Sequence, residues 1–395
     1  MTDQGQGMHE GPPEFARTRI YNVKIILPSI NSDVRQHCAS MENCNSIRTV
    51  MIKRSFSPRS TKDNYMKKTI IAACMGLTLV QPAIAADFKP AVVYDKAGKF
   101  DKSFNEAVFR GAEKFKKDTG VEVKEVEPTN EAQVEQGLEK LARRGSSPIV
   151  AVGFSQANAV SSVSAKYPDV QFTLIDMVVD NPNVHSIVFK EHEGSFLVGA
   201  LAAMKSATGK VGFIGGMDIP LIRKFGCGFE QGAKYENPKA EVFTNMIGST
   251  GAAFNNPGKA AELAKSQFDS GADVIFAAAG SSGSGVYQAA KDVGKYAIGV
   301  DSNQNHLHPG TMLTSMVKRV DVAAYSNWMA AKDGKWEPGV QALGLAENGV
   351  DWALDEHNRA LVTKEMEEKV NQIKADIISG KIKVHDYMSD NSCKY

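Results

Sequence analysis

From Ala86 onward, short apolar runs alternate with amphipathic stretches, and this alternation limits the chain to one fold class. The amphipathic stretches carry apolar residues at helical spacing, whereas the apolar runs are short and strand-like. An alternation of strand and helix predicts a parallel sheet with helices on both faces. The first series predicts strands at Lys89–Tyr94, Val121–Val126, Ile149–Val152, Phe172–Ile175 and His185–Phe189, and helices at Ser103–Asp118, Glu131–Arg144, Asn158–Tyr167 and Glu193–Lys205.

The same order then begins again. It predicts strands at Lys210–Ile214, Glu241–Ile247, Val274–Ala278 and Ala297–Val300, and helices at Leu221–Tyr235, Pro257–Gly271 and Gly285–Val293. The rest of the chain adds strands at Leu313–Val317 and near Ala342–Leu343, and helices at Val320–Lys332 and Lys364–Ser379. The 310 residues from Ala86 to the end suffice for two lobes of ordinary size. The predicted fold class is therefore α/β, with two doubly wound lobes of similar design.

The segment Met66–Ala86 has the pattern of a secretory signal peptide. It has a basic start, an apolar run of 12 residues and an Ala-x-Ala ending. A buried helix and a single membrane anchor are the alternatives, but a spanning helix needs about 20 apolar residues. We expect residues 1–65 to be a disordered upstream extension, residues 66–85 to be the signal peptide and the secreted protein to begin near Ala86. No cysteine follows the cleavage site, so a lipid anchor is not expected.

Charge and cysteine content limit the possible partners and bonds. From Ala86 onward the chain has 35 basic and 39 acidic residues, which argues against a protein that binds nucleic acid. The same part keeps two cysteines, Cys227 and Cys393. In an oxidising compartment they are a plausible disulfide between the C-terminal tail and a loop at Phe225–Cys227, and two free thiols are the alternative.

Polar and aromatic residues follow the predicted strands, where ligands bind in open α/β sheets. The set contains three carboxylates, a lysine, an asparagine and two aromatic rings. Carboxylates accept hydrogen bonds from sugar hydroxyls, and aromatic rings stack on flat rings or sugar faces. The residues are Asp95, Phe104, Asn105, Asp176, Phe225, Gly280, Asp301 and Lys318.

Three other patterns in the sequence bear on local structure and chemistry. Ser103 with Glu106 three residues later predicts a capping box at the start of a helix. The glycine run Gly280–Gly285 lacks the ending of a phosphate loop, which favours a tight strand-to-helix turn against a neutral ligand. His306 and His308 have no partner at metal-ligand spacing, which favours a solvated loop. With no nucleophile elbow or zinc motif in the sequence, a binding protein is the simplest interpretation.

Four motifs resemble the basic membrane protein family of ABC-transporter substrate-binding proteins, whose best-understood members bind purine nucleosides. The motifs are Asp101–Asn105, Gly280–Gly285, Ile298–Gln304 and Leu313–Lys318. The resemblance covers Ala86–Tyr395 and implies the type I periplasmic-binding-protein fold, two Rossmann-like lobes with a three-crossing hinge. It places residues 86–208 and about 313–335 in the first lobe, and residues 209–312 and about 336–395 in the second.

The resemblance also implies a role for each candidate residue. Phe104 and Phe225 would sandwich the base, and Asp176 would read the edge of the base. The ribose hydroxyls would be held by Asn105, Asp301 and Lys318, with Asp95 nearby and the backbone of Gly280 contributing.

The implied function is a monomeric periplasmic protein that binds a nucleoside, with a purine nucleoside favoured. It would close about its hinge and deliver the ligand to a permease and ATPase complex in the inner membrane, with no cofactor, metal or catalysis. Many family members are lipoproteins, and the missing lipidation cysteine favours an unanchored protein here. The alternatives are a sugar-binding protein of the same fold, a ligand sensor, and a nucleoside hydrolase in which Asp95, Asp176 and Asp301 hold a metal.

Overall fold

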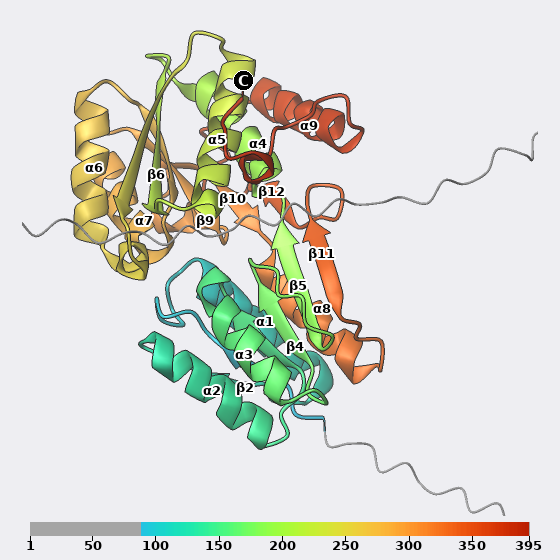
Figure 1. Cartoon of the computed structure of the whole chain (residues 1–395). Coiled ribbons are helices and arrows are strands. Elements are labelled where there is room, and N and C mark those ends of the chain that lie inside the picture. The colour runs from blue at the N-terminus through green and yellow to red at the C-terminus, as the bar shows by residue number, and fades with distance from the viewer. Residues whose placement is uncertain (1–87, 395) are drawn as a thin grey trace, which may run out of the picture. The chain divides into compact units, whose positions relative to one another are not determined.

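The computed structural model describes residues 88–394, which contain two six-stranded sheets (Figure 1). The first sheet has the strand order β11-β5-β4-β3-β1-β2, and all its neighbouring strands pair in parallel. Its strands are β1 (Ala91–Val93), β2 (Lys124–Val126), β3 (Ile149–Val152), β4 (Phe172–Ile175), β5 (Val184–Phe189) and β11 (Gly339–Leu343).

The second sheet has the order β12-β10-β9-β8-β6-β7. Its strands are β6 (Lys210–Met217), β7 (Glu241–Gly248), β8 (Val274–Ala278), β9 (Tyr296–Asp301), β10 (Met312–Lys318) and β12 (Val350–Trp352). The pairs are parallel except that β12 runs antiparallel to β10. The sequence analysis did not predict β12, which has Asp351 between its two apolar residues. The α/β class with two mainly parallel sheets is confirmed.

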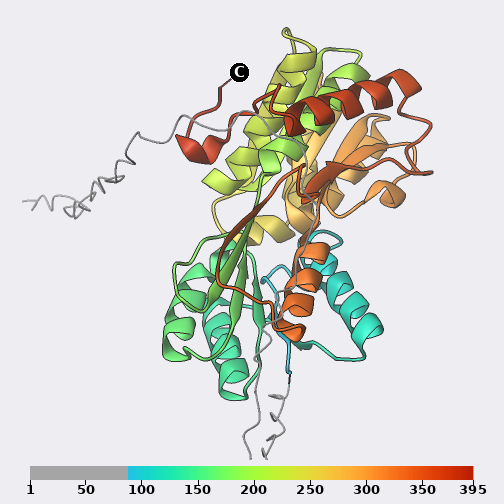
Figure 2. The ribbon, with the colours of Figure 1, turned by 90° about the vertical axis from the view of Figure 1, so that its right-hand side faces the viewer.

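Helices cover both faces of each sheet, as predicted. On the first sheet, α1 (Phe104–Thr119) and α8 (Val320–Lys332) pack side by side on one face, and α2 (Glu131–Arg143) and α3 (Ala157–Lys166) cover the other (Figure 2). On the second sheet, α4 (Glu191–Lys205) and α5 (Pro220–Glu236) cover one face, with α9 (Lys364–Ile378) against α4. The opposite face carries α6 (Pro257–Asp269) and α7 (Gly283–Asp292).

The strands read as continuous apolar runs because both faces of each sheet are buried. All five residues of β8 are buried. In β1, Val92 joins the core beneath α1 and α8, while Ala91 and Val93 join the core beneath α2 and α3. The ends of these rigid strands provide fixed positions for the polar residues that follow them.

The chain crosses between the sheets three times within residues 88–394, which agrees with the three-crossing hinge. The crossings lie between β5 and α4, between β10 and α8, and between β11 and β12. They differ from the boundaries predicted at residues 208, 313 and 335. The helix α4 packs on α5 and β10, β10 pairs in the second sheet, and β11 pairs with β5 in the first. A helix after a strand can pack on either sheet, and no local sequence signal records the choice.

The helices α4 and α5 approach closely through glycines. A Cβ atom at Gly232 would lie 2.0 Å from the carbonyl oxygen of Phe196, and one at Gly199 would lie 2.0 Å from that of Phe229. Such distances leave no room for a methyl group between the two backbones. This helix pair carries Glu191 and Lys224, which take part in the ion pairs described below.

Among the helices of residues 88–394, none is long and apolar enough to cross a membrane. The predicted upstream extension (residues 1–65) and signal peptide (residues 66–85) lie outside the described residues.

Candidate functional site

A cavity of about 270 Å³ lies at the carboxyl ends of strands from both sheets, and all eight predicted ligand residues line it. The first sheet and its helices contribute Asp95, Phe104, Asn105 and Asp176. The second contributes Phe225, Gly280, Asp301 and Lys318. The rule that ligands bind beyond the strand ends thus brings these residues to one place, although the individual roles remain predictions.

Sequence reasoning missed two aromatic residues of the cavity, Phe154 and Phe254. Their ring centroids are 6.5 Å apart and their planes are inclined at 62°. Phe154 lies in the turn η1 (Phe154–Gln156) after β3, and Phe254 lies in the turn η2 (Gly251–Asn255) after β7. Phe154 follows a predicted strand by two residues, so the same strand-end rule could have found it.

Lys318 occupies the centre of a buried ion-pair cluster. Its Nζ lies 2.7 Å from Oδ1 of Asp176 and 3.0 Å from Oε1 of Glu191. Burial disfavours the Lys318 ammonium, but the carboxylates of Asp176, Glu191 and Asp301 outweigh it and raise the lysine pKa. Lys318 is therefore a fixed positive charge in the cavity wall.

Three aromatic rings surround the Lys318 ammonium. Its Nζ lies 5.2 Å from the ring centroid of Phe104, 5.0 Å from that of Phe189 and 5.6 Å from that of Phe225. Rings at such distances attract a cation through their quadrupole. The two rings predicted to hold a base thus both lie beside the same lysine.

Asp176 directly follows β4 and Asp301 is the last residue of β9, and both have a left-handed backbone conformation, with φ values of 76° and 61°. Non-glycine residues adopt this region at an energetic cost, and such residues concentrate at functional sites. Burial raises the pKa of Asp301 to about 6, with Lys318 acting in the opposite direction. Burial also raises the pKa of Asp176, again against the effect of Lys318.

The predicted capping box at the start of α1 is wrong. The side chain that caps this helix belongs to Asp101, which accepts from the backbone N–H groups of Ser103 at 2.8 Å, Asn105 at 3.0 Å and Glu106 at 3.2 Å. Ser103 instead donates its hydroxyl to Oδ2 of Asp301 at 2.5 Å. A bond between residues 198 positions apart has no local signal in the sequence.

Further hydrogen bonds join the same two loops, one from each sheet. The hydroxyl of Ser302 donates to the backbone oxygen of Ser103 at 2.7 Å, and Nε2 of Gln304 donates to that of Lys102 at 2.8 Å. Arg110 on α1 donates to the Ser302 hydroxyl at 2.6 Å. The loop before α1 and the loop after β9 therefore touch at one side of the cavity.

Asn105 lines the cavity, but its side chain is already engaged. Nδ2 donates to the backbone oxygens of Asp95 and Gly98 at 3.1 and 3.0 Å, and Oδ1 accepts from the backbone N–H of Asp95 at 3.0 Å. Both amide donors are thus occupied. The side chain fixes the loop after β1, and one lone pair of Oδ1 is left for a ligand.

The loops at the ends of β3 and β8 are shaped by glycines, and the loop after β3 contacts Asp95. Asp95 accepts from the Ser155 hydroxyl at 3.0 Å, and burial raises its pKa. Gly153 has a φ of 103°, and a Cβ there would lie 3.2 Å from Oδ2 of Asp95. Gly280 has a φ of 55° and opens the turn η3 (Gly280–Ser282), which leads into α7. The glycine run is therefore a strand-to-helix turn, as predicted.

Cys227 and Cys393 form a disulfide with their Cα atoms 5.4 Å apart. Cys227 lies within α5, which agrees with the helix predicted at Leu221–Tyr235 and not with a loop at Phe225–Cys227. The bond attaches the last described residues of the chain to the helix that carries Phe225.

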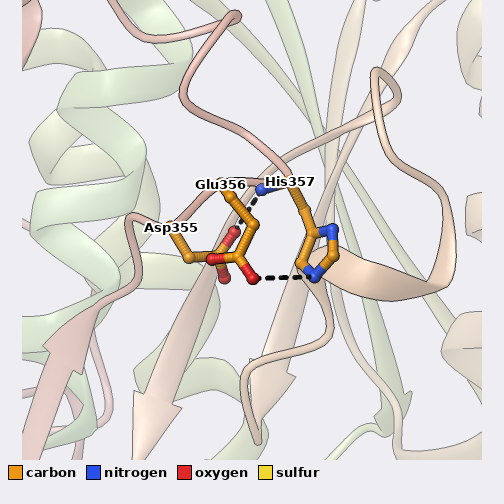
Figure 3. A group of neighbouring side chains, drawn as sticks. All are labelled: Asp355, Glu356 and His357. Atoms are coloured by element: carbon orange, nitrogen blue, oxygen red, sulfur yellow. Dashed lines mark hydrogen bonds and ion pairs between the residues drawn. The ribbon is translucent and has the colours of Figure 1, made fainter.

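Asp355, Glu356 and His357 form a cluster of neighbouring side chains (Figure 3). None of the three lines the cavity. Among residues 88–394, these are the three His, Cys, Asp or Glu side chains whose possible metal-ligand atoms all lie within 4.8 Å of one another. Oδ2 of Asp355 accepts from Nδ2 of Asn303 at 2.6 Å and from Nδ2 of Asn305 at 3.1 Å. Its other oxygen accepts from the backbone N–H of His357 at 2.8 Å. The cluster thus supports the loop that follows Asp301.

Comparison with known proteins identifies the family. Residues 88–387 match the family model Bmp, described as "ABC transporter substrate-binding protein PnrA-like". The chain belongs to the Bmp family. This confirms the resemblance found in the sequence motifs, and the family consists of solute-binding proteins. The protein is thus the substrate-binding component of an ABC transporter system, with a place outside the cytoplasm and permease and ATPase components as partners.

Individual relatives and a solved structure agree with this family assignment. The CD4+ T-cell-stimulating antigen of Listeria monocytogenes is 34% identical over 321 residues, which cover 75% of this chain and 88% of the relative. An uncharacterized lipoprotein of Pyrococcus abyssi is 33% identical over 300 residues, covering 73% of this chain and 74% of the relative. The crystal structure of an ABC transporter solute-binding protein from Aeropyrum pernix matches with a TM-score of 0.69 and 28% identity, over 75% of this chain and 92% of that one. The type I fold is confirmed.

Proposed function

We propose that this Bmp-family protein binds a nucleoside, with a purine nucleoside favoured, in the cavity between its two sheets. The observation that carries the proposal is the joint presence of aromatic rings and buried charged groups in one cavity. Phe104 and Phe225 flank the Lys318 ammonium, and Asp176 and Asp301 line the same space. A nucleoside combines a flat base with ribose hydroxyls, so its two halves match these two kinds of group.

In the proposed complex the Phe104 and Phe225 rings stack on the base, and Asp176 accepts hydrogen bonds at its edge. Asp301 and Lys318 bind the ribose hydroxyls, together with the free lone pair of Asn105. Asp95 and the backbone of Gly280 complete the pocket. Because the contacts come from both sheets, the ligand favours a closed arrangement about the three crossings.

We propose binding without catalysis. Asp95 accepts from Ser155, Asp176 pairs with Lys318 and Asp301 accepts from Ser103, so each carboxylate already has a protein partner. We further propose a periplasmic monomer, exported by the predicted signal peptide and free of a lipid anchor, that delivers its ligand to an inner-membrane permease and ATPase. Relatives from three Pyrococcus species are named lipoproteins, so fractionation with and without detergent is the test of the last point.

Ligand-dependent stabilisation tests the proposed function. The protein from Ala86 onward, stripped of ligand by unfolding and refolding, is heated with inosine, guanosine, adenosine, uridine, ribose or glucose. A ligand at 100 times its Kd stabilises the folded state by about 2.7 kcal/mol, which raises Tm by several degrees. We expect this rise with a purine nucleoside and none with ribose. A rise with a sugar alone would identify a sugar-binding protein, and release of free base from inosine would identify a hydrolase.

The variant Phe225→Ala separates a stacked base from a bare sugar. The ring is 3% exposed and lines the cavity, so its loss should weaken nucleoside binding by about 1–3 kcal/mol. Tyr235→Ala is the control on the same helix, because Tyr235 is 51% exposed and does not line the cavity. Equal nucleoside affinity of Phe225→Ala and wild type, measured by titration calorimetry, would rule out stacking at this position.

Nucleoside affinity should fall as the pH drops from 7 to 5. The pKa of Asp301 is raised to about 6, so the carboxylate that accepts ribose hydroxyls is ionised at pH 7 and becomes protonated below pH 6. One such group lowers the association constant by up to about tenfold per pH unit below its pKa. Asp301→Asn should bind weakly throughout and show a shallower fall with pH, because Asp176, whose pKa burial also raises, still titrates in the same range. The surface variant Asp118→Asn should keep the full dependence. A flat wild-type profile would contradict the proposed contact.

A further inference from the structure

We propose that the C-terminal segment 385–393, which we call the clasp, positions the charged groups of the ligand cavity from outside it. Within the described part of the chain, no clasp residue lines the cavity. The clasp is joined to α5 by the disulfide from Cys393 to Cys227. Its proposed effect on ligand affinity rests on the proposed nucleoside function, whereas its effect on α5 does not.

The clasp contacts α5 at three successive points. The backbone N–H of His385 donates to Oε1 of Gln231 at 2.8 Å, and Nε2 of Gln231 donates back to the His385 oxygen at 2.9 Å. Asp386 lies 3.4 Å from Nζ of Lys224 through its Oδ2. With the disulfide, these contacts fix α5 over two turns, from Lys224 to Gln231. The fixed stretch includes Phe225, whose ring lines the cavity.

From Lys224 a chain of buried ion pairs leads to the cavity. Nζ of Lys224 lies 3.1 Å from Oε2 of Glu191, and Oε1 of Glu191 lies 3.0 Å from Nζ of Lys318. The side chains of Lys224, Glu191 and Lys318 are only 7%, 1% and 2% exposed. Lys224 and Lys318 share the two oxygens of one carboxylate, so the position of either lysine depends on the other.

Asp386 supplies the outer negative charge of this chain of ion pairs. Without the Asp386 carboxylate, Lys224 keeps Glu191 as its one carboxylate partner among the contacts described. Lys224 then draws Glu191 away from Lys318. The Lys318 ammonium then shifts toward Asp176, away from the position proposed for the ribose contact. Asp386 is therefore a positioning residue, because it acts on the ligand through Lys224 and Glu191.

Four variants test the clasp. Asp386→Asn removes the outer charge, Asp386→Glu restores it, and the double variant Cys227→Ser/Cys393→Ser removes the disulfide. Asp390→Asn is the matched control, because Asp390 lies in the same segment and binds His385, Ser392 and Lys394 but not Lys224. An asparagine at this position keeps an oxygen that can accept from Nε2 of His385. Each variant is measured by hydrogen exchange of the α5 amides without ligand, and by calorimetric titration with inosine.

We expect Asp386→Asn and the cysteine double variant to speed amide exchange over residues 222–228 and to weaken inosine binding roughly three- to tenfold. Asp386→Glu should restore both properties, and Asp390→Asn should change neither. Unchanged exchange in α5 would overturn the clasp whether or not inosine binds, as would unchanged inosine affinity in variants of a protein that binds inosine. Faster exchange in a protein that binds no nucleoside would refute the proposed ligand and leave the clasp as a support of α5.

Discussion

Replacing Lys318 by methionine should cause the largest loss of ligand binding of any single change in the cavity. The ammonium lies within 3.0 Å of carboxylate oxygens from Asp176 and Glu191 and is 2% exposed. Its removal leaves buried negative charges without their partner, which costs about 3–5 kcal/mol of folding stability. Loss of the proposed ligand contact should weaken nucleoside binding by about 2–5 kcal/mol. Urea unfolding and calorimetric titration measure the two effects.

A second substitution separates these two effects. Adding Asp176→Asn to Lys318→Met removes one unpaired carboxylate, so stability should partly recover while the nucleoside affinity stays low. Lys99→Met is the matched control, because Lys99 also pairs with a carboxylate and lies near two aromatic rings but does not line the cavity. Full affinity in Lys318→Met would show that this lysine does not contact the ligand.

Replacing Gly232 by alanine should destabilise the protein by about 2–3 kcal/mol, although alanine is the better helix former. The new methyl would lie 2.0 Å from the carbonyl oxygen of Phe196, so α4 and α5 would have to separate. Gly258→Ala is the control. Gly258 lies in α6, and a Cβ atom there would have its nearest neighbour, Oδ1 of Asn256, at 3.9 Å. That variant should be neutral or more stable by up to about 1 kcal/mol.

The same separation of helices should reach the cavity. Glu191 begins α4, and Lys224 and Phe225 belong to α5, so a shift between the helices moves the ion-pair chain and one aromatic wall together. Thermal unfolding of Gly232→Ala and Gly258→Ala measures the difference directly. Equal melting temperatures for Gly232→Ala and wild type would show that the helices separate without cost.

Much of the site was predictable because parallel sheets bring distant strand ends together. Asp95, Asp176 and Asp301 each follow a strand that the apolar pattern identifies, and the structure places all three on one cavity. The glycine run after β8 was predictable for the same reason. The periodicity of apolar residues indicates which residues face a core, and so it locates each strand. Once a strand is located, the position of the residue just past its end follows.

The contacts that join the two sheets were not predictable in this way. The sequence predicts Ser103 as a local helix cap, but its hydroxyl binds Asp301 of the other sheet directly, while Asp101 caps the helix. The sheet to which α4 belongs was also missed, since its fit against α5 depends on the glycines that let the two backbones meet. Such choices depend on tertiary packing, which leaves no periodic signal in a single sequence.

The measurement that tests the central claim most directly is isothermal titration of the ligand-stripped protein from Ala86 onward with purine nucleosides, pyrimidine nucleosides and ribose. We expect a purine nucleoside to bind in a one-to-one complex at micromolar or lower Kd, equivalent to about −8 kcal/mol or better, with ribose silent. A Kd above roughly 100 μM for every nucleoside would contradict the proposed function and leave the Bmp-family fold with a different ligand.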